Sequence, residues 1–194
     1  INMRYVSDLY KTNPEYFSDI TILRSMTSTG KSSLCKNIVE SLPEKKIMTT
    51  LIDYKLRRQR VIYICSSKAL TYSVAISYAE CDLTLYCSTQ KNHNGTHRLA
   101  TTINSLWRIL KNGEAPTYDL AIFDEQISIT NDLFCECTKK FQKCCSALTQ
   151  ILRNKKTKVL FLDAHCNDMS VEFAKIGGRE ITFINNQWMP SKKM

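Results

Sequence analysis

The feature that most constrains the fold is a repeated alternation of short apolar runs with longer helix-like stretches. The clearest apolar run, Arg60–Ser66, combines β-branched residues with a tyrosine and is typical of a buried strand. Because strand–helix alternation with right-handed crossovers builds a doubly wound sheet, we predict an α/β fold with a mostly parallel sheet and helices on both faces. The expected strands are Ile20–Arg24, Arg60–Ser66, Leu83–Cys87, Leu99–Ile103, Tyr118–Phe123, Lys158–Leu162 and Glu180–Ile184, and the expected helices are Lys31–Ser41, Lys68–Glu80, Asn104–Lys111, Ile127–Asn154 and Met169–Ile176.

Composition limits the class of protein. The 194 residues, 43% of them hydrophobic and 23% charged, are expected to form one domain over residues 1–194 and exclude a disordered or coiled-coil chain. No apolar run approaches the ~20 residues that span a bilayer, so no membrane partner is expected. The absence of a signal-like start and the nine cysteines favour reduced thiols at a nuclear or cytoplasmic site, not secretion. Because the chain opens on Ile1, we expect a piece of a longer protein.

The formal net charge of +9 suits a polyanionic partner such as nucleic acid. Two stretches concentrate the excess. Lys36–Lys68 holds eight Lys or Arg residues against three acids, and Lys139–Lys158 holds seven and no acid. A solvated helix face or loop is the alternative explanation for either stretch.

The segment Ser25–Ser32 reads S-M-T-S-T-G-K-S and fits the phosphate-binding loop pattern, except that serine replaces the first glycine. It follows an expected strand and opens an expected helix, which aims backbone N–H groups at an anion. Lys31 would meet the β- and γ-phosphates of ATP, and the Ser32 hydroxyl would bind Mg²⁺. An ordinary strand–loop–helix turn remains the alternative. The predicted nucleotide-binding residues are Ser25, Met26, Thr27, Ser28, Thr29, Gly30, Lys31, Ser32 and Ser33.

A second segment, Tyr118–Glu125, is an apolar strand that ends in two carboxylates. The carboxyl ends of parallel strands form the ligand crevice of an open sheet. Asp124 is therefore expected to hold Mg²⁺ and Glu125 to polarise the attacking water, which with Lys31 gives three predicted catalytic residues. Helix capping by Asp124 is the alternative.

A third apolar strand ends in Asp163-Ala164-His165 at the same predicted edge. Polar groups beside the γ-phosphate could sense the state of the nucleotide. A plain strand end with a cap explains the same residues equally well.

Taken in order, these three segments resemble motifs I, II and III of the first RecA-like domain of a superfamily 2 DEAD/DEAH-like helicase. The resemblance is more specific to the herpesvirus-type replication origin-binding protein family, whose motif III has an L-D-A-D form similar to the segment Leu160–Asp168. Val61–Leu70 is similar to motif Ia, and Thr101–Trp107 is similar to motif Ib, before motif II. Serines stand at 25 and 28, where glycines are common in motif I.

The resemblance implies a RecA-like P-loop NTPase domain that uses ATP and Mg²⁺ to move on single-stranded DNA during replication, with RNA as an alternative substrate. It implies a nucleic-acid path along Ser66, Ser67, Lys68, Thr101 and Thr102. It also implies that Asp163 and His165 couple the nucleotide to that path. A second RecA-like domain, which would supply an arginine finger, is expected to lie outside this chain.

Two other functions remain open. A small P-loop nucleotide kinase would need an arginine-rich lid, whereas Arg153 and Arg179 are isolated in the sequence. A degenerate remnant that binds nucleic acid without catalysis would fit the altered loop.

No structural metal is expected. Cys135 and Cys137 are separated by one residue and Cys144 and Cys145 by none, whereas zinc sites favour C-x₂₋₄-C pairs. His93 and His97 flank Gly95 in a polar loop and are not expected to form a metal pair.

Overall fold

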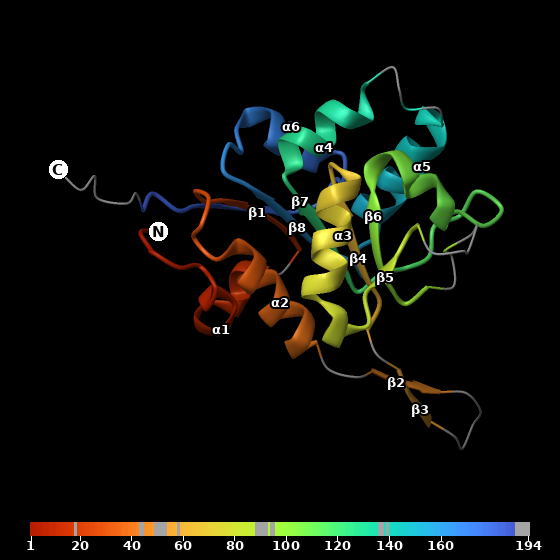
Figure 1. Ribbon diagram of the computed structural model, residues 1–194, viewed down its shortest axis with the longest axis horizontal. Helices are drawn as coiled ribbons and strands as arrows, with labels where there is room; N and C mark the ends of the chain where they lie inside the picture. Colours follow the sequence, from red (N-terminus) through yellow and green to blue (C-terminus); the bar gives the residue numbers. More distant parts are fainter. Residues whose placement is uncertain are drawn as a thin grey trace.

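A seven-stranded sheet, all of whose strands run parallel, forms the centre of the computed structural model (Figure 1). The structure describes residues 1–17, 19–42, 45–48, 54–57, 59–87, 93, 96–135, 138 and 140–188. The strand order is β5-β6-β4-β7-β8-β1-β9. The strands are β1 (Ile20–Arg24), β4 (Val61–Cys65), β5 (Thr84–Leu85), β6 (Arg98–Thr102), β7 (Leu120–Asp124), β8 (Lys158–Asp163) and β9 (Ile181–Asn185).

Helices cover both faces of this sheet. Side chains alternate between two buried clusters along each central strand: on β4, Ile62 and Ile64 belong to one cluster, and Val61 and Tyr63 to the other. The first cluster packs against η3 (Ile103–Ile109), α4 (Gln126–Leu133), α5 (Phe141–Arg153) and α6 (Asp168–Lys175). The second packs against α1 (Leu9–Thr12), η1 (Pro14–Phe17), α2 (Lys31–Ser41) and α3 (Lys68–Ser77), which η2 (Ala79–Cys81) follows. The predicted doubly wound architecture is confirmed.

All seven predicted strands are present, with ends shifted by one or two residues. The prediction of one helix over Ile127–Asn154 is wrong, because the chain breaks there into α4 and α5. Thr138 lies in the break, where its hydroxyl oxygen is 2.7 Å from the Asn104 side-chain oxygen and 2.9 Å from the Asp132 carbonyl oxygen. Its contact with Asn104 ties the turn to η3, which is a 3₁₀ helix and not the predicted α-helix.

The sequence analysis expected no strand between α2 and β4, but a hairpin lies there. Strands β2 (Lys45–Met48) and β3 (Tyr54–Arg57) pair antiparallel and project away from the body of the protein (Figure 1). The hairpin leaves from the edge at which the sheet strands begin. Much of the basic stretch Lys36–Lys68 therefore belongs to a segment at the edge opposite the strand ends. None of the helices in the described parts of the chain is long and apolar enough to span a membrane.

Candidate functional site

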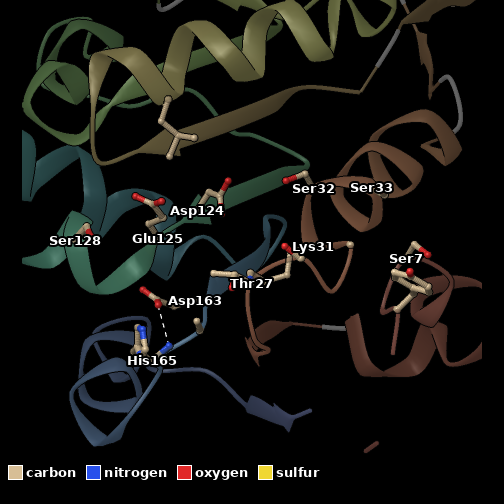
Figure 2. Close-up of a pocket in the computed structure, with 15 residues that line it drawn as sticks. Ser7, Thr27, Lys31, Ser32, Ser33, Asp124, Glu125, Ser128, Asp163 and His165 are labelled. Carbon is tan, nitrogen blue, oxygen red and sulfur yellow. Dashed lines mark hydrogen bonds between the residues drawn. The ribbon is translucent and has the colours of Figure 1, made fainter. Parts of the chain in front are cut away.

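A cavity of 710 Å³ opens at the sheet edge where β1, β7 and β8 end (Figure 2). This volume lies within the range of ~300–1,000 Å³ typical of small-molecule sites. The predicted site residues that line the cavity are Thr27, Ser28, Gly30, Lys31, Ser32, Ser33, Asp124, Glu125, Asp163 and His165. The sequence analysis missed five further lining residues, Tyr5, Ser7, Leu70, Ser128 and Ala164.

The loop between β1 and α2 forms one wall of the cavity. Gly30 caps α2 with a left-handed backbone, φ 82°, which glycine adopts without a steric penalty. The Lys31 ammonium group donates hydrogen bonds to the carbonyl oxygens of Ser25, at 2.6 Å, and Met26, at 2.8 Å. The amine is therefore folded over its own loop, beside the N-terminus of α2.

Two residues predicted to bind nucleotide support the loop from behind instead of lining the cavity. Ser25 and Thr29 are buried, and their hydroxyl oxygens lie 2.7 Å apart. Asn186, which follows β9, donates to the Ser25 hydroxyl at 3.0 Å and to the Met3 carbonyl oxygen at 2.8 Å. The serine at the usual glycine position thus joins the loop to the end of β9 and to the N-terminal segment. Met26 lines a neighbouring hollow.

Ser28 has a left-handed backbone conformation, with φ 62°. A side chain at such a position costs ~1–3 kcal/mol, which is why glycine is favoured there. The loop therefore has the backbone shape that glycine would give it, but with conformational strain.

Asp124 sits at the end of β7 and accepts a hydrogen bond from the Tyr63 hydroxyl at 2.9 Å. Burial raises the pKa of the Asp124 carboxyl, while the Tyr63 hydrogen bond and the Lys31 charge partly oppose the rise. The sequence analysis placed Tyr63 in the core; it is buried, but it also orients this carboxylate. The Tyr63 ring packs edge-to-face on Tyr78, whose hydroxyl donates to the Ser32 carbonyl oxygen at 2.7 Å.

Burial also affects Lys31, which is the cation of the site. It lowers the pKa of the Lys31 amine, and the nearby negative charges of Asp124 and Asp163 oppose this effect. An anion placed at the loop would offset the cost of keeping this buried amine charged.

Asp163, at the end of β8, links two parts of the site. Its carboxylate accepts hydrogen bonds from the backbone N–H of Ile127 and of His165, both at 2.9 Å. The first contact caps the N-terminus of α4, directly after Asp124 and Glu125. Asp163 therefore contacts the helix that begins directly after the predicted catalytic residues.

The predicted nucleic-acid path is only partly exposed. Thr101 and Thr102 are buried, at 1% and 6% exposure, so they offer little side-chain surface. Ser66, Ser67 and Lys68 lie at the accessible end of β4, where Ser67 caps α3 by accepting from the Leu70 N–H. The Ser66 hydroxyl donates to the Glu125 carboxylate at 2.9 Å.

Within the described residues, no group of three or more His, Cys, Asp or Glu side chains could hold a metal ion. His93 is buried, and its Nε2 lies 2.9 Å from the Tyr86 carbonyl oxygen. Cys137 and Gly95 lie outside the described residues.

We predict that Ser28→Gly raises the free energy of unfolding by about 0.5–1 kcal/mol, because glycine removes the left-handed strain but gives the unfolded chain more freedom. Urea denaturation measures the change. Ser73→Gly, in the exposed part of α3, is the matched control, and its free energy of unfolding should fall by about 1 kcal/mol. A similar loss in both variants would contradict strain at Ser28.

Asp124→Asn should stabilise the protein at pH 7 in the absence of nucleotide and Mg²⁺. Folding raises the pKa of this carboxyl above its ordinary 3.8, so the linked stability is complete below the unfolded pKa and is lost as pH rises through the folded pKa. The substitution removes that loss and keeps an acceptor for Tyr63.

Urea denaturation at pH 4 and pH 7 tests this expectation, and the stabilisation should be larger at pH 7. Asp132→Asn, on the half-exposed side of α4, is the control and should change little. Equal stability of the wild type and Asp124→Asn at both pH values would show that the Asp124 charge carries no burial cost.

Comparisons with known proteins identify the family and the fold. The sequence matches the family model described as origin of replication binding protein over residues 31–191. A search of curated proteins finds no significant match.

The structure is similar to solved helicase domains. A DEAD box protein from the hyperthermophile Methanococcus jannaschii aligns with a TM-score of 0.59 and 14% identity, over 88% of this chain and 46% of that chain. S. cerevisiae Dbp5 bound to RNA and ADP BeF3 aligns with a TM-score of 0.66 and 14% identity, over 95% of this chain and 46% of that chain. The chain thus spans less than half the length of these two proteins. It has the RecA-like fold of a helicase domain and, because the family match covers most of its length, it belongs to the origin of replication binding protein family.

Proposed function

We propose that this chain is the ATP-binding RecA-like domain of a replication helicase, and that it couples ATP hydrolysis to movement on single-stranded DNA. The observation that carries the proposal is the meeting of Lys31, Asp124 and Glu125 around one cavity, supplied by two different strand ends. The family's description as origin binding supports a DNA substrate. Dbp5, which shares the fold, is bound to RNA and ADP BeF3, which supports a nucleotide and a nucleic-acid strand as joint ligands.

The phosphate loop prepares the site for a polyphosphate. The Lys31 amine bonds two loop carbonyl oxygens, and phosphate oxygens would be stronger acceptors because they are charged. Lys31 would therefore turn from the loop to the β- and γ-phosphates. The N-terminal N–H groups of α2 would complete the cradle.

The donor set fits Mg²⁺. Ser32 and Asp124 lie around the same hollow (Figure 2), and they offer oxygen atoms, which this ion prefers. Burial raises the pKa of Asp124, so a cation beside this carboxylate would offset the cost of its negative charge. Bound there, Mg²⁺ would neutralise charge on the phosphate oxygens.

We propose that Glu125 accepts a proton from the attacking water. Its left-handed backbone, φ 59°, turns the chain sharply after β7, and its carboxylate lines the cavity beside Asp124. No arginine lines the cavity among the described residues. We propose that an arginine from a second RecA-like domain stabilises the transition state, a contribution worth ~10³–10⁵ in rate in related phosphoryl transfers.

A nucleotide kinase is less well supported. Arg179 is held in a contact of 2.6 Å with Asp19 and donates to the carbonyl oxygens of Asn154 and Thr157. Arg153 donates to the Ile176 carbonyl oxygen. Neither arginine lines the cavity, where a kinase lid would place it.

We predict that Lys31→Ala weakens binding of Mg²⁺·ATP at least about tenfold, because hydrogen bonds to charged groups contribute ~1.5–3 kcal/mol. Glu125→Gln should bind Mg²⁺·ATP normally but lose most single-turnover hydrolysis. Calorimetry measures the affinity, and release of labelled phosphate measures the rate.

Lys36→Ala is the control for Lys31→Ala, since Lys36 pairs with Glu40 and Glu80 on the outer side of α2. Equal affinities of the wild type and Lys31→Ala would overturn the assignment of the loop and favour a remnant that does not bind nucleotide. Normal hydrolysis by Glu125→Gln would overturn the assignment of the base.

Binding of an oligothymidylate should weaken steeply with salt, and Lys68→Ala should reduce the slope of log K against log salt by about 0.7. Lys68 is exposed at the start of α3, where a strand can reach it. Fluorescence anisotropy between 50 and 200 mM salt measures the slope. Lys175→Ala, in a surface pair with Glu172, should leave the slope unchanged; an equal change in both variants would mean that Lys68 makes no particular contact.

A further inference from the structure

The strand register brings a residue of the predicted DNA path to the catalytic carboxylate. Strands β4 and β7 are parallel neighbours, with Cys65 opposite Asp124 in their last paired positions. The next residues, Ser66 and Glu125, therefore leave the sheet side by side. The Ser66 hydroxyl donates a hydrogen bond to Oε2 of Glu125, with 2.9 Å between the two oxygens.

This hydrogen bond restrains the Glu125 carboxylate, the proposed proton acceptor for the attacking water. Glu125 precedes α4, yet its side chain makes no capping hydrogen bond to that helix. In the described part of the chain, the Ser66 hydroxyl is the hydrogen-bond donor to this carboxylate. A donated hydrogen bond stabilises the negative charge and so makes the carboxylate a weaker acceptor for the proton of water.

The other side of Ser66 faces the start of α3, which has the chemistry of a phosphate site. Ser66 stands directly before the capping residue Ser67 and the exposed Lys68. The N-terminus of the ten-residue α3 adds a partial positive charge. A phosphodiester of a bound strand would meet an ammonium group, a helix terminus and two hydroxyls there.

A serine hydroxyl has a single proton to donate. The Ser66 proton can bond either the Glu125 carboxylate or a phosphate oxygen, but not both. The Glu125 carboxylate and the phosphate of a bound strand thus compete for one hydroxyl proton.

We infer that Ser66 is a positioning residue that reports strand binding to Glu125, and that a phosphodiester of single-stranded DNA at the start of α3 draws the Ser66 hydroxyl away from the carboxylate. The inference rests on the proposed function and adds its regulation. Without a strand, Glu125 is held by Ser66 and hydrolysis is slow. With a strand, the released carboxylate accepts the proton of the attacking water.

The experiment compares Ser66→Ala with Ser66→Thr, which keeps a hydroxyl, and with Ser73→Ala, on the exposed side of α3. Single-turnover ATP hydrolysis is measured with and without an oligothymidylate, in the full-length protein that carries the proposed second RecA-like domain. Ser66→Ala should raise the rate without DNA at least about tenfold, in line with the loss of one hydrogen bond to a charged group. Its stimulation by DNA should fall by the same factor. Ser66→Thr, which keeps the hydroxyl, should still be stimulated by DNA, and Ser73→Ala should behave as the wild type.

A second readout does not depend on turnover. The side-chain carboxyl ¹³C resonance of Glu125, assigned with Glu125→Gln, should shift when the oligothymidylate is added to the wild type. Ser66→Ala should show the same shift without DNA and no further shift with it. A purely structural role for Ser66 would not link these two shifts.

The outcomes separate this inference from the proposed function. If Lys31→Ala leaves ATP binding intact, the function itself fails. If the wild type is stimulated by DNA and Ser66→Ala is stimulated equally, only the inference fails. The inference is also overturned if Ser66→Ala lowers the hydrolysis rate both with and without DNA, because Ser66 would then assist Glu125. It is overturned as well if DNA does not stimulate the wild type, because Ser66 would then report no strand binding.

Discussion

The site depends on the parallel register of four neighbouring strands. Arg24 of β1 pairs with Asp163 of β8, Asp124 of β7 with Leu162 of β8, and Cys65 of β4 with Asp124. The strands therefore end together, and the residue that follows each end enters the same space. A shift of one residue would turn each strand-end side chain to the other face of the sheet, so the two buried clusters that fix the register also fix the chemistry.

The buried polar groups at this edge restrain one another. Asp163 holds the start of α4, and Asn186 holds Ser25 behind the phosphate loop. Buried polar atoms are costly unless they are hydrogen-bonded, so each of these contacts is difficult to rearrange alone. The exposed contact between Ser66 and Glu125 differs in this respect, because water or a ligand can replace either partner. A contact that must change during a reaction cycle belongs at such an accessible position.

The sequence was sufficient for the parts of the site that local patterns encode. Lys31, Asp124 and Glu125 follow apolar strands within continuous motifs, and the structure places all three around one cavity. The roles of Tyr63 and Asn186 were missed, because each depends on a partner distant in sequence. An apolar pattern gives Tyr63 a place in the core but does not reveal that its hydroxyl meets Asp124.

In the fold too, local sequence patterns predicted some elements, whereas others depend on contacts between residues distant in sequence. The strands were predicted from hydrophobic runs, whereas the division of the Ile127–Asn154 segment into two helices depends on Thr138 and its contact with Asn104. No helix-breaking glycine or proline marks that turn in the sequence. The β2–β3 hairpin was missed for another reason, since its basic residues were assigned to a charged surface and not to paired strands.

Under the proposed function, net charge and specific chemistry would make separate contributions to nucleic-acid binding. Much of the basic stretch Lys36–Lys68 lies on the β2–β3 hairpin, at the edge opposite the cavity, so its charge can raise affinity without touching the nucleotide site. Ser66 and Lys68 lie at the strand end beside Glu125. Under the proposed function, charge on the hairpin would help to retain a strand, whereas Ser66, which donates a hydrogen bond to the Glu125 carboxylate, would change the rate of hydrolysis. Affinity and coupling would then respond to different substitutions, because the hairpin and Ser66 lie at opposite edges of the seven-stranded sheet.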